Sequence, residues 1–283
     1  MSLSLSISVR SYNELDDCIR LANSINAAHR NALAIYSFEL EVNWFDNSAE
    51  QIQSSLISFL SNNLAKCVKL NFISGDNNDF SYWRSTETAI LAASSQYVLL
   101  LSGHCILPPN TIVEIITKLK SDTYDCIVIP TAINPFHFPA FSEFLYILLF
   151  NNKIFLSFLN FAPSRFLASY PFSNSSALYR VESLRDYPIP RIEGNEDSIW
   201  LKTYPCNYSI LASTAILHSH KPRRRLSLRR RKIRAVLARQ SAPIILFRMT
   251  TKFISAFFIY PYYLVAYFSN RFSSPNDLFV NWR

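Results

Sequence analysis

QYVLLLSGHCILPP, at residues 96–109, carries the clearest structural signal in the chain. Its apolar run, Tyr97–Leu101, has the length and composition of a buried β-strand, and the two prolines prevent that strand from continuing. The small turn Ser102-Gly103-His104 therefore follows a core strand, and parallel α/β sheets bind their ligands beyond the carboxyl ends of such strands. The turn predicts a ligand site, with an ordinary strand-to-helix turn that exposes a surface histidine as the alternative.

Glycine is scarce in this chain, because only three of the 283 residues are glycine. Gly103 therefore indicates a backbone that turns sharply or lets another group approach closely. Three isolated glycines cannot form the Gly-rich loop of a P-loop nucleotide site or the Gly-rich turn of a dinucleotide site. Any nucleotide that this protein binds must be held by other groups.

The chain before residue 130 alternates between strand-like and helix-like segments. Strict alternation over Ser2–Arg10 predicts a strand, and the spacing of apolar residues from Leu15 to Ile25 predicts a helix. The same criteria predict strands at residues 32–38, 68–73, 97–101 and 126–130, and helices at residues 52–60, 80–94 and 111–120. This order predicts an α/β fold with a mostly parallel sheet flanked by helices.

The pattern changes after Pro130. Residues 136–168 are unusually aromatic, but their apolar blocks are shorter than the ~20 residues that a membrane span needs. A helical hairpin packed on the sheet and a lipid-facing insertion both fit this segment. Further on, a short helix at 198–204 opens on Glu196 and Asp197, which serve either as helix caps or as functional carboxylates. A last strand is predicted at 210–217.

The positive charge of the chain is local. The formal net charge is +8, yet residues 221–234 hold nine lysines or arginines, which leaves 28 − 9 = 19 basic against 20 acidic residues elsewhere. This distribution favours a surface-binding segment over a cationic groove through the fold. The run has no interleaved aromatic residues and no recognisable nucleic-acid module, so no nucleic-acid partner is expected.

An aromatic segment follows the basic run. Residues 241–268 are rich in phenylalanine and tyrosine, and their charge-free part, residues 253–268, is 16 residues long and contains Pro261. That length and the proline favour an in-plane or re-entrant helix pair at a membrane surface over a straight span. Packing of these aromatics onto the rest of the protein, or onto a second subunit, is the alternative.

The five cysteines are scattered, odd in number and without a C-x-x-C pair. They predict reduced, buried thiols and no disulfide framework or zinc site. The amino-terminal residues lack the basic and apolar regions of a cleaved signal, so secretion by that route is not expected.

Six segments, taken together and in order, give the chain a resemblance to bacterial family 2 glycosyltransferases of the GT-A fold. The resemblance covers residues 7 to about 230 and is closest to the subgroup related to rhamnosyl and other polysaccharide sugar transferases. The segments are ISVRSYNELDDCIRLANSI, FSYWRSTETAILAASSQYVLLLS, SGH, FSNSSALYR, NEDSIWLKTY and AILHSHKPRRRLSLRRR.

The resemblance implies a role for each matching position. The donor-binding positions are Ser11, Tyr12, Asn13, Ser37, Glu39, Arg84, Ser102 and Gly103, where Ser37 and Glu39 stand near the family's aspartate after the second strand. The Glu-Asp base motif falls on Glu196 and Asp197, with Asp197 as the general base. The acceptor-side positions are Asn174, Ser175 and Trp200.

The SGH turn departs from the family's Asp-x-Asp metal motif. Ser102 and His104 replace the two aspartates, so that one imidazole remains to contact a metal, joined by the later His218 and His220. Mg²⁺ and Mn²⁺ prefer oxygen ligands, although Mn²⁺ also accepts imidazole. The sequence therefore leaves undecided whether a divalent metal is a cofactor, whereas the location of the donor site does not depend on a metal.

The expected protein is an inverting glycosyltransferase that moves a sugar from a nucleotide-sugar donor to a lipid-linked or other glycan acceptor in surface polysaccharide synthesis. Residues 1–220 would form the GT-A domain, and residues 221–283 a basic and aromatic helical region. Residues 221–268 would hold the enzyme on the cytoplasmic face of the inner membrane, in a peripheral or re-entrant manner. The alternative is an inactive GT-A-like scaffold of a glycan assembly complex, which the missing aspartates favour.

Overall fold

The computed structural model of this protein describes about half of the chain in detail. The described residues are 3–64, 68–75, 82–129, 131–133, 176–188, 190–191, 207–211, 214, 216–218 and the single positions 250, 254, 257, 260, 261 and 264. Within them, no helix is both long and apolar enough to cross a bilayer.

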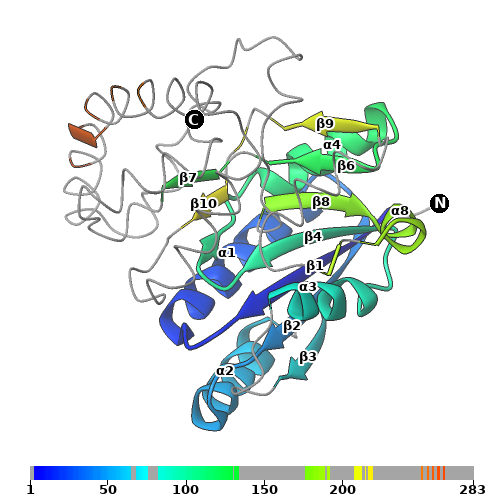
Figure 1. The fold of residues 1–283 in the computed structure, drawn as a ribbon. Coiled ribbons are helices and arrows are strands. Elements are labelled where there is room, and N and C mark those ends of the chain that lie inside the picture. Colours follow the sequence, from blue (N-terminus) through cyan, green and yellow to red (C-terminus); the bar gives the residue numbers. More distant parts are fainter. Residues whose placement is uncertain are drawn as a thin grey trace.

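A seven-stranded sheet forms the centre of the molecule (Figure 1), with the strand order β3-β2-β1-β4-β8-β6-β9. Its strands are β1 (Leu3–Ser11), β2 (Phe38–Asp46), β3 (Lys69–Ser74), β4 (Tyr97–Ser102), β6 (Cys126–Val128), β8 (Ser176–Arg180) and β9 (Tyr208–Ile210). Strands β3, β2, β1 and β4 run parallel, β8 is antiparallel to both of its neighbours, and β9 is parallel to β6. The carboxyl ends of four adjacent strands therefore meet at one edge of the sheet.

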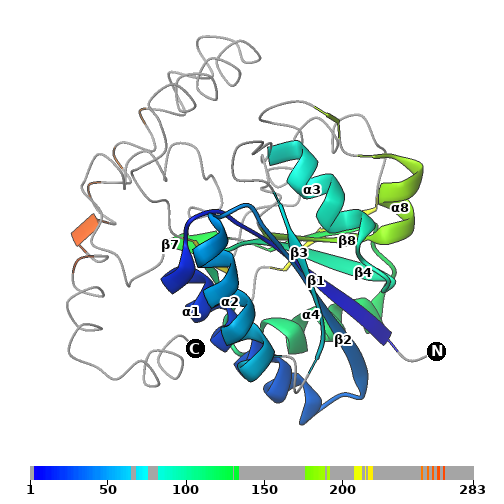
Figure 2. The same ribbon diagram turned by 90° about the horizontal axis from the view of Figure 1, so that it is seen from below.

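Helices cover both faces of this sheet (Figure 2). On one face lie α1 (Leu15–Leu33), α2 (Glu50–Asn63) and α4 (Thr111–Ser121), and on the other lie α3 (Tyr82–Leu91) and α8 (Val181–Asp186). Each face has its own apolar core, because the side chains of a strand alternate between the two faces.

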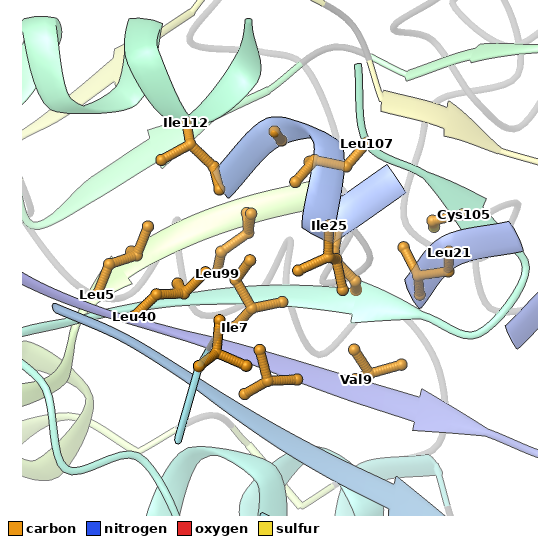
Figure 3. Close-up of a cluster of buried hydrophobic side chains, with 14 of the residues drawn as sticks. Leu5, Ile7, Val9, Leu21, Ile25, Leu40, Leu99, Cys105, Leu107 and Ile112 are labelled. Carbon is orange, nitrogen blue, oxygen red and sulfur yellow. The ribbon is translucent and has the colours of Figure 1, made fainter. Parts of the chain in front are cut away.

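The larger core lies beneath α1. Leu5, Ile7 and Val9 of β1 face Leu21 and Ile25 of α1, and all five side chains are buried (Figure 3). Burying one such side chain stabilises the fold by roughly 1.5–3 kcal/mol relative to leaving it exposed. Strand β4 is buried along its whole length, as a central parallel strand covered on both faces must be.

A second, three-stranded sheet continues from the carboxyl end of β4. It consists of β5 (Cys105–Ile106), β10 (Ile216–His218) and β7 (Thr131–Ile133), with β10 between the other two. Strand β10 runs antiparallel to β5, and His218 stands opposite Cys105 in the register. The chain near residue 218 is therefore brought next to the turn at residues 102–104.

Most of the strands and helices predicted within the described residues are confirmed, with two corrections. The strand predicted at 32–38 is wrong, because α1 continues to Leu33 and the strand that follows is β2 at Phe38–Asp46. The strand predicted at 210–217 is also wrong, because this stretch divides between β9 and β10, which belong to different sheets. The segments at 136–168, 198–204 and 221–249 lie outside the described residues.

Candidate active site at the carboxyl edge of the sheet

Polar residues end the three central parallel strands. Ser11 closes β1 and stands opposite Asp46, the last residue of β2, while Arg10 stands opposite Ser102, the last residue of β4. Because these strands are adjacent and parallel, their polar ends form one continuous edge (Figure 1). This is the place where the sequence predicts a ligand.

Asp46 is the acidic centre of that edge. Its Oδ1 accepts hydrogen bonds from Ser11 Oγ at 2.6 Å and from Ser48 Oγ at 2.8 Å, and Trp44 Nε1 donates to Ser11 Oγ at 2.9 Å. Burial raises the pKa of the Asp46 carboxyl above its ordinary value, although the hydrogen bonds from Ser11 and Ser48 oppose the rise. The site therefore holds a buried carboxylate whose hydrogen bonds only partly replace its lost hydration.

Asp46 takes the position that the sequence analysis gave to Ser37 or Glu39. Glu39 is paired with Ser4 near the amino end of β1, and Ser37 precedes the strand altogether. Both lie at the edge of the sheet opposite to Ser11, and this corrects their placement. The correct position follows from the alternation of FELEVNWFD, which is that of a strand ending at residue 46.

The turns after β1 and β2 are tied together beside Asp46. The backbone N–H of Asn13 donates to Ser48 Oγ at 2.7 Å, and the N–H of Ala49 donates to Asn13 Oδ1 at 3.4 Å. Asn13 has a φ of 53°, a left-handed conformation that asparagine tolerates better than most residues. Ser11, Tyr12 and Asn13 thus stand at the carboxyl end of β1, with Tyr12 half-buried.

The end of β3 is fastened to the same turn by Gln53 of α2. Its Nε2 donates to the carbonyl oxygens of Asp46, Ser48 and Gly75 at 3.1, 2.8 and 3.0 Å. Gly75 packs so tightly that an added Cβ would lie 2.4 Å from Asn47 Nδ2. Three strand ends are therefore held in one fixed arrangement around the Asp46 carboxylate.

Gly103 provides the close approach that its scarcity predicts. Its N–H donates to the carbonyl oxygen of Arg10 at 2.7 Å, and an added Cβ would lie 2.7 Å from Ser11 Cβ and 2.9 Å from Cys18 Sγ. No side chain fits there without displacing its neighbours. The turn between Ser102 and His104 is thus pressed against the end of β1 and the first turn of α1.

His104 is buried and paired with a carboxylate that the sequence analysis did not single out. Its Nδ1 lies 2.8 Å from Glu14 Oε2, and the two residues are only 6% and 7% exposed. Glu14 is the residue that precedes α1. The pairing was not predictable locally, because 90 residues separate the partners.

Two arginines lie on the α3 side of the edge. Arg84 is exposed on α3, and Arg10 is buried, with its guanidinium donating to Thr86 Oγ1 of the same helix. Arg10 was not predicted as a site residue, because a charged residue inside an alternating strand is indistinguishable from a surface position. Arg10 stands opposite Ser102 in the strand register, and Arg84 lies two residues before Thr86 on α3.

The thiols near the turn are unreactive. Cys18 and Cys105 are buried beside Gly103, and burial raises the pKa of the Cys105 thiol to about 12 and that of Cys18 well above its usual range. Cys126 is also free and buried. These three residues confirm the predicted reduced, buried thiols, and neither thiol near the turn is available as a nucleophile.

The remaining predicted site residues are placed only in part. The backbone of His218 is next to Cys105, one residue from His104, through the β5–β10 pairing. The side chain of His218 lies outside the described residues, as do His220, Asn174, Ser175, Glu196, Asp197 and Trp200. Among the described side chains, no three His, Cys, Asp or Glu residues gather into a metal-binding group.

The described side chains of the turn offer a single candidate metal ligand, the imidazole of His104. Histidines that ligate metals almost always give their other ring nitrogen to a carboxylate or carbonyl, and His104 is paired in this way with Glu14. A cation at this turn would take its other ligands from bound phosphate oxygens, water, or residues beyond the described part.

Comparison with known proteins supports the fold. No protein-family model and no curated protein matches the chain. Among solved structures, it is similar to S. aureus TarS 1–349 in complex with UDP-GlcNAc, with 18% identity and a TM-score of 0.53 over 80% of this chain and 60% of that chain. It is also similar to the mannosyltransferase PcManGT from Pyrobaculum calidifontis in complex with GDP-Man and Mn²⁺, with 14% identity and a TM-score of 0.59 over 95% and 74% of the two chains.

These likenesses show a shared fold. The chain is an α/β protein of the GT-A type, with a mostly parallel sheet, as the sequence predicts. It spans about three fifths of the TarS chain.

Proposed function

We propose that this protein is an inverting glycosyltransferase that transfers a sugar from a nucleotide-sugar donor to a glycan acceptor. The observation that carries the proposal is the buried carboxylate of Asp46, held by Ser11 and Ser48 at the carboxyl edge of three parallel strands. The shared fold with structures that hold UDP-GlcNAc and GDP-Man supports a nucleotide sugar as the donor.

The donor would lie along the edge from Asp46 to His104. A buried carboxylate suits the N–H or hydroxyl groups of a nucleoside, because its negative charge makes it a strong hydrogen-bond acceptor. Asn13 stands beside it, and the half-buried Tyr12 of the same turn would stack on the base. The diphosphate would then reach the turn of Ser102, Gly103 and His104, with Arg84 on the neighbouring helix as a source of positive charge.

The leaving diphosphate needs its developing charge stabilised. A divalent ion such as Mn²⁺, held by His104 with His218 and His220, would supply that stabilisation when bound. The protein's own contribution is the fixed turn, because Gly103 is packed against Ser11 and His104 is held by Glu14. Such preorganisation lowers the barrier, since the groups need not rearrange during the reaction.

The acceptor hydroxyl would lose its proton to Asp197, with Glu196 positioning that base or the acceptor. Asn174, Ser175 and Trp200 are proposed to contact the acceptor. A single base that activates the acceptor opposite the leaving group inverts the configuration at the anomeric carbon. General-base catalysis of this kind contributes ~10²–10⁴ in rate.

We further propose that the acceptor is lipid-linked and that the protein works in surface polysaccharide synthesis on the cytoplasmic face of the inner membrane. The basic residues of 221–234 would attract anionic headgroups with ~1 kcal/mol each near the surface. Exposed apolar side chains support a lipid contact further on, because Ile254 is 54% and Phe257 is 61% exposed on helical positions.

Fractionation tests this attachment. The full chain should be recovered with membranes and be partly released by high salt, whereas a variant ending at Ser241 should be recovered mainly in the soluble fraction. Equal membrane recovery of the two proteins would contradict the proposal, and so would a full chain that stays soluble without detergent or lipid.

A scaffold without activity is the second candidate, because Ser102 and His104 stand where the family has metal-binding aspartates. A thermal-shift screen of UDP, GDP, dTDP and their sugars, with and without Mn²⁺, tests for a donor site, because a ligand of the native state must raise the melting temperature. Hydrolysis of the selected nucleotide sugar, or its transfer to a lipid acceptor, then identifies an enzyme. Donor binding without either reaction would favour the scaffold.

A further inference from the structure

The start of α2 is held without a capping side chain. Ala49 stands at the N-cap position, where it makes no side-chain hydrogen bond, and alanine is among the poorest residues for that position. Instead, the side chain of Gln53, in the first turn of the helix, reaches back to the loop that precedes it. The loop that carries Asp46 and Ser48 is therefore fastened from the helix side.

Three backbone carbonyl oxygens converge on the amide of Gln53. Its Nε2 lies 3.1 Å from the carbonyl oxygen of Asp46, 2.8 Å from that of Ser48 and 3.0 Å from that of Gly75. A carbonyl oxygen only accepts hydrogen bonds, so the nitrogen end of the amide faces all three, and one of its two hydrogens serves two carbonyls. A hydrocarbon side chain could not replace these contacts, and a carboxylate would set its negative charge against three carbonyl dipoles.

These contacts reach the carboxylate of Asp46 through Ser48. Gln53 holds the carbonyl of Ser48, and the hydroxyl of the same serine donates to Asp46 Oδ1 at 2.8 Å. The N–H of Asn13 donates to that hydroxyl oxygen at 2.7 Å, which joins the turn after β1 to the same point. The carbonyl of Asp46 accepts a hydrogen bond from the N–H of Gly75 at 2.8 Å as well as from Gln53. Gln53 thus fixes both the backbone of Asp46 and one of the hydroxyl groups that hold its buried carboxylate.

We propose that Gln53 is a positioning residue that holds the turn at residues 46–48 in place and so presents the Asp46 carboxylate to the nucleoside of the donor. This inference rests on the proposed function, in which that carboxylate accepts hydrogen bonds from the nucleoside. Gln53 acts through Asp46 and does not itself contact the donor. Its effect is therefore confined to the nucleoside end of the site, whereas the turn at residues 102–104 serves the diphosphate.

The experiment is a calorimetric titration of the full chain, without metal, with UDP, GDP and dTDP and with the corresponding bare nucleosides. Gln53→Met removes the amide at similar length and should weaken nucleotide binding by about 2- to 10-fold, which corresponds to the loss of one neutral hydrogen bond. Gln53→Glu keeps the shape of glutamine but replaces the donor by a negative charge, and it should weaken binding more than Gln53→Met does. Because the lost contact lies on the nucleoside, the fold loss should be the same for a nucleoside and its diphosphate.

Two comparisons distinguish positioning from general damage. Gln51 lies in the same turn of α2 but is exposed, so Gln51→Met should leave nucleotide affinity unaltered, and Gln51→Glu measures the effect of an added negative charge, which the loss in Gln53→Glu should exceed. Combining Gln53→Met with Asp46→Asn should give a loss smaller than the product of the two single losses, because Gln53 acts through Asp46. Circular dichroism identifies any variant that does not fold, and Gln53→Met carries the comparison if Gln53→Glu is such a variant.

The proposal is overturned if Gln53→Met binds nucleotide as tightly as the unaltered chain, even where its melting temperature is lowered, because Gln53 would then only stabilise the fold. It is also overturned if the losses from Gln53→Met and Asp46→Asn multiply fully, or if the diphosphates lose more affinity than the nucleosides. Failure of the proposed function is a different result, namely that none of these ligands binds the unaltered chain, and it would remove this inference together with that function.

Discussion

Substituting Asp46 by asparagine should separate binding from stability. The carboxylate accepts three hydrogen bonds, from Ser11 Oγ, Ser48 Oγ and the backbone N–H of Ser48 at 2.6, 2.8 and 3.3 Å, and it is fully buried. Asparagine has the same shape, and the serine hydroxyls can rotate to meet its amide. The substitution therefore removes the charge and leaves the packing of the site largely as it is.

The expected loss in affinity follows from the charge. A hydrogen bond to an ionised group is worth about 1.5–3 kcal/mol, against 0.5–1.5 kcal/mol for a neutral pair. If the nucleoside contacts Asp46, Asp46→Asn should weaken nucleotide binding by up to about 10-fold, and by up to about 100-fold if two contacts are lost. Isothermal titration with the nucleotide chosen by the thermal-shift screen measures this loss.

Although Asp46→Asn should lower nucleotide affinity, it should not lower the stability of the fold. Folding raises the pKa of Asp46, so the native state binds this proton more tightly than the unfolded chain does. Ionising the group at neutral pH therefore costs stability, and this cost disappears as the pH falls below the unfolded pKa of about 3.9. Asp46→Asn should melt no lower than the unaltered chain at pH 7.5, and its relative gain should shrink towards pH 4.

Asp186→Asn, an exposed change on α8, is the matched control and should alter neither the nucleotide affinity nor the stability. The reasoning is refuted if Asp46→Asn binds nucleotide as tightly as the unaltered chain. It is also refuted if the variant is markedly less stable at pH 7.5 but not at pH 4, because the carboxylate would then be a stabilising group.

Three further outcomes are expected. Asp197→Asn should lower the rate of sugar transfer by ~10²–10⁴ while the nucleotide still binds, because a general base acts on the acceptor. Near-normal turnover would show that another residue is the base. His104→Ala should weaken binding of a nucleoside diphosphate more than binding of the bare nucleoside. Equal losses of affinity for these two ligands would mean that His104 only stabilises its turn. Glu41→Gln should destabilise the fold at neutral pH. The stability difference between this variant and the unaltered chain should narrow as the pH falls from 4.5 towards 2, because the folded pKa of Glu41 is lowered to about 2. A difference in their urea-unfolding midpoints that stays constant over this pH range would contradict the assignment.

Strong local periodicity made most of the fold predictable. Strand β1, helix α1 and strand β4 each bury a regular set of apolar residues, and the single glycine of the SGH turn correctly indicated a close approach. The position of the candidate site follows from these elements, because it depends only on which strands are parallel and adjacent. This part of the structure is determined by short-range pattern.

The errors have long-range causes. Strand β2 was misplaced because the apolar run at 32–38 resembles a strand, although the alternating residues 38–46 form it and even Glu41 and Asn43 within it are buried. Burial raises the pKa of Glu41, but hydrogen bonds from Ser6 Oγ and from the N–H and Oγ of Ser94 outweigh it. Those partners come from distant parts of the chain, as does the His104 partner of Glu14. A sequence read locally cannot distinguish such satisfied buried groups from solvated ones.

The position of β8 has a consequence for synthesis of the protein. This strand enters the middle of the sheet between β4 and β6, although it is made 78 residues after β4, from Ser102 to Arg180. At 5–20 residues per second a ribosome needs about 4–16 s to cover that distance. During this interval the nascent chain carries an unpaired, largely apolar strand edge at β4, which is the kind of surface that pairs with other chains. Shorter fragments that end before residue 176 would keep that edge permanently, so cooperative folding of this domain has to wait for its second half.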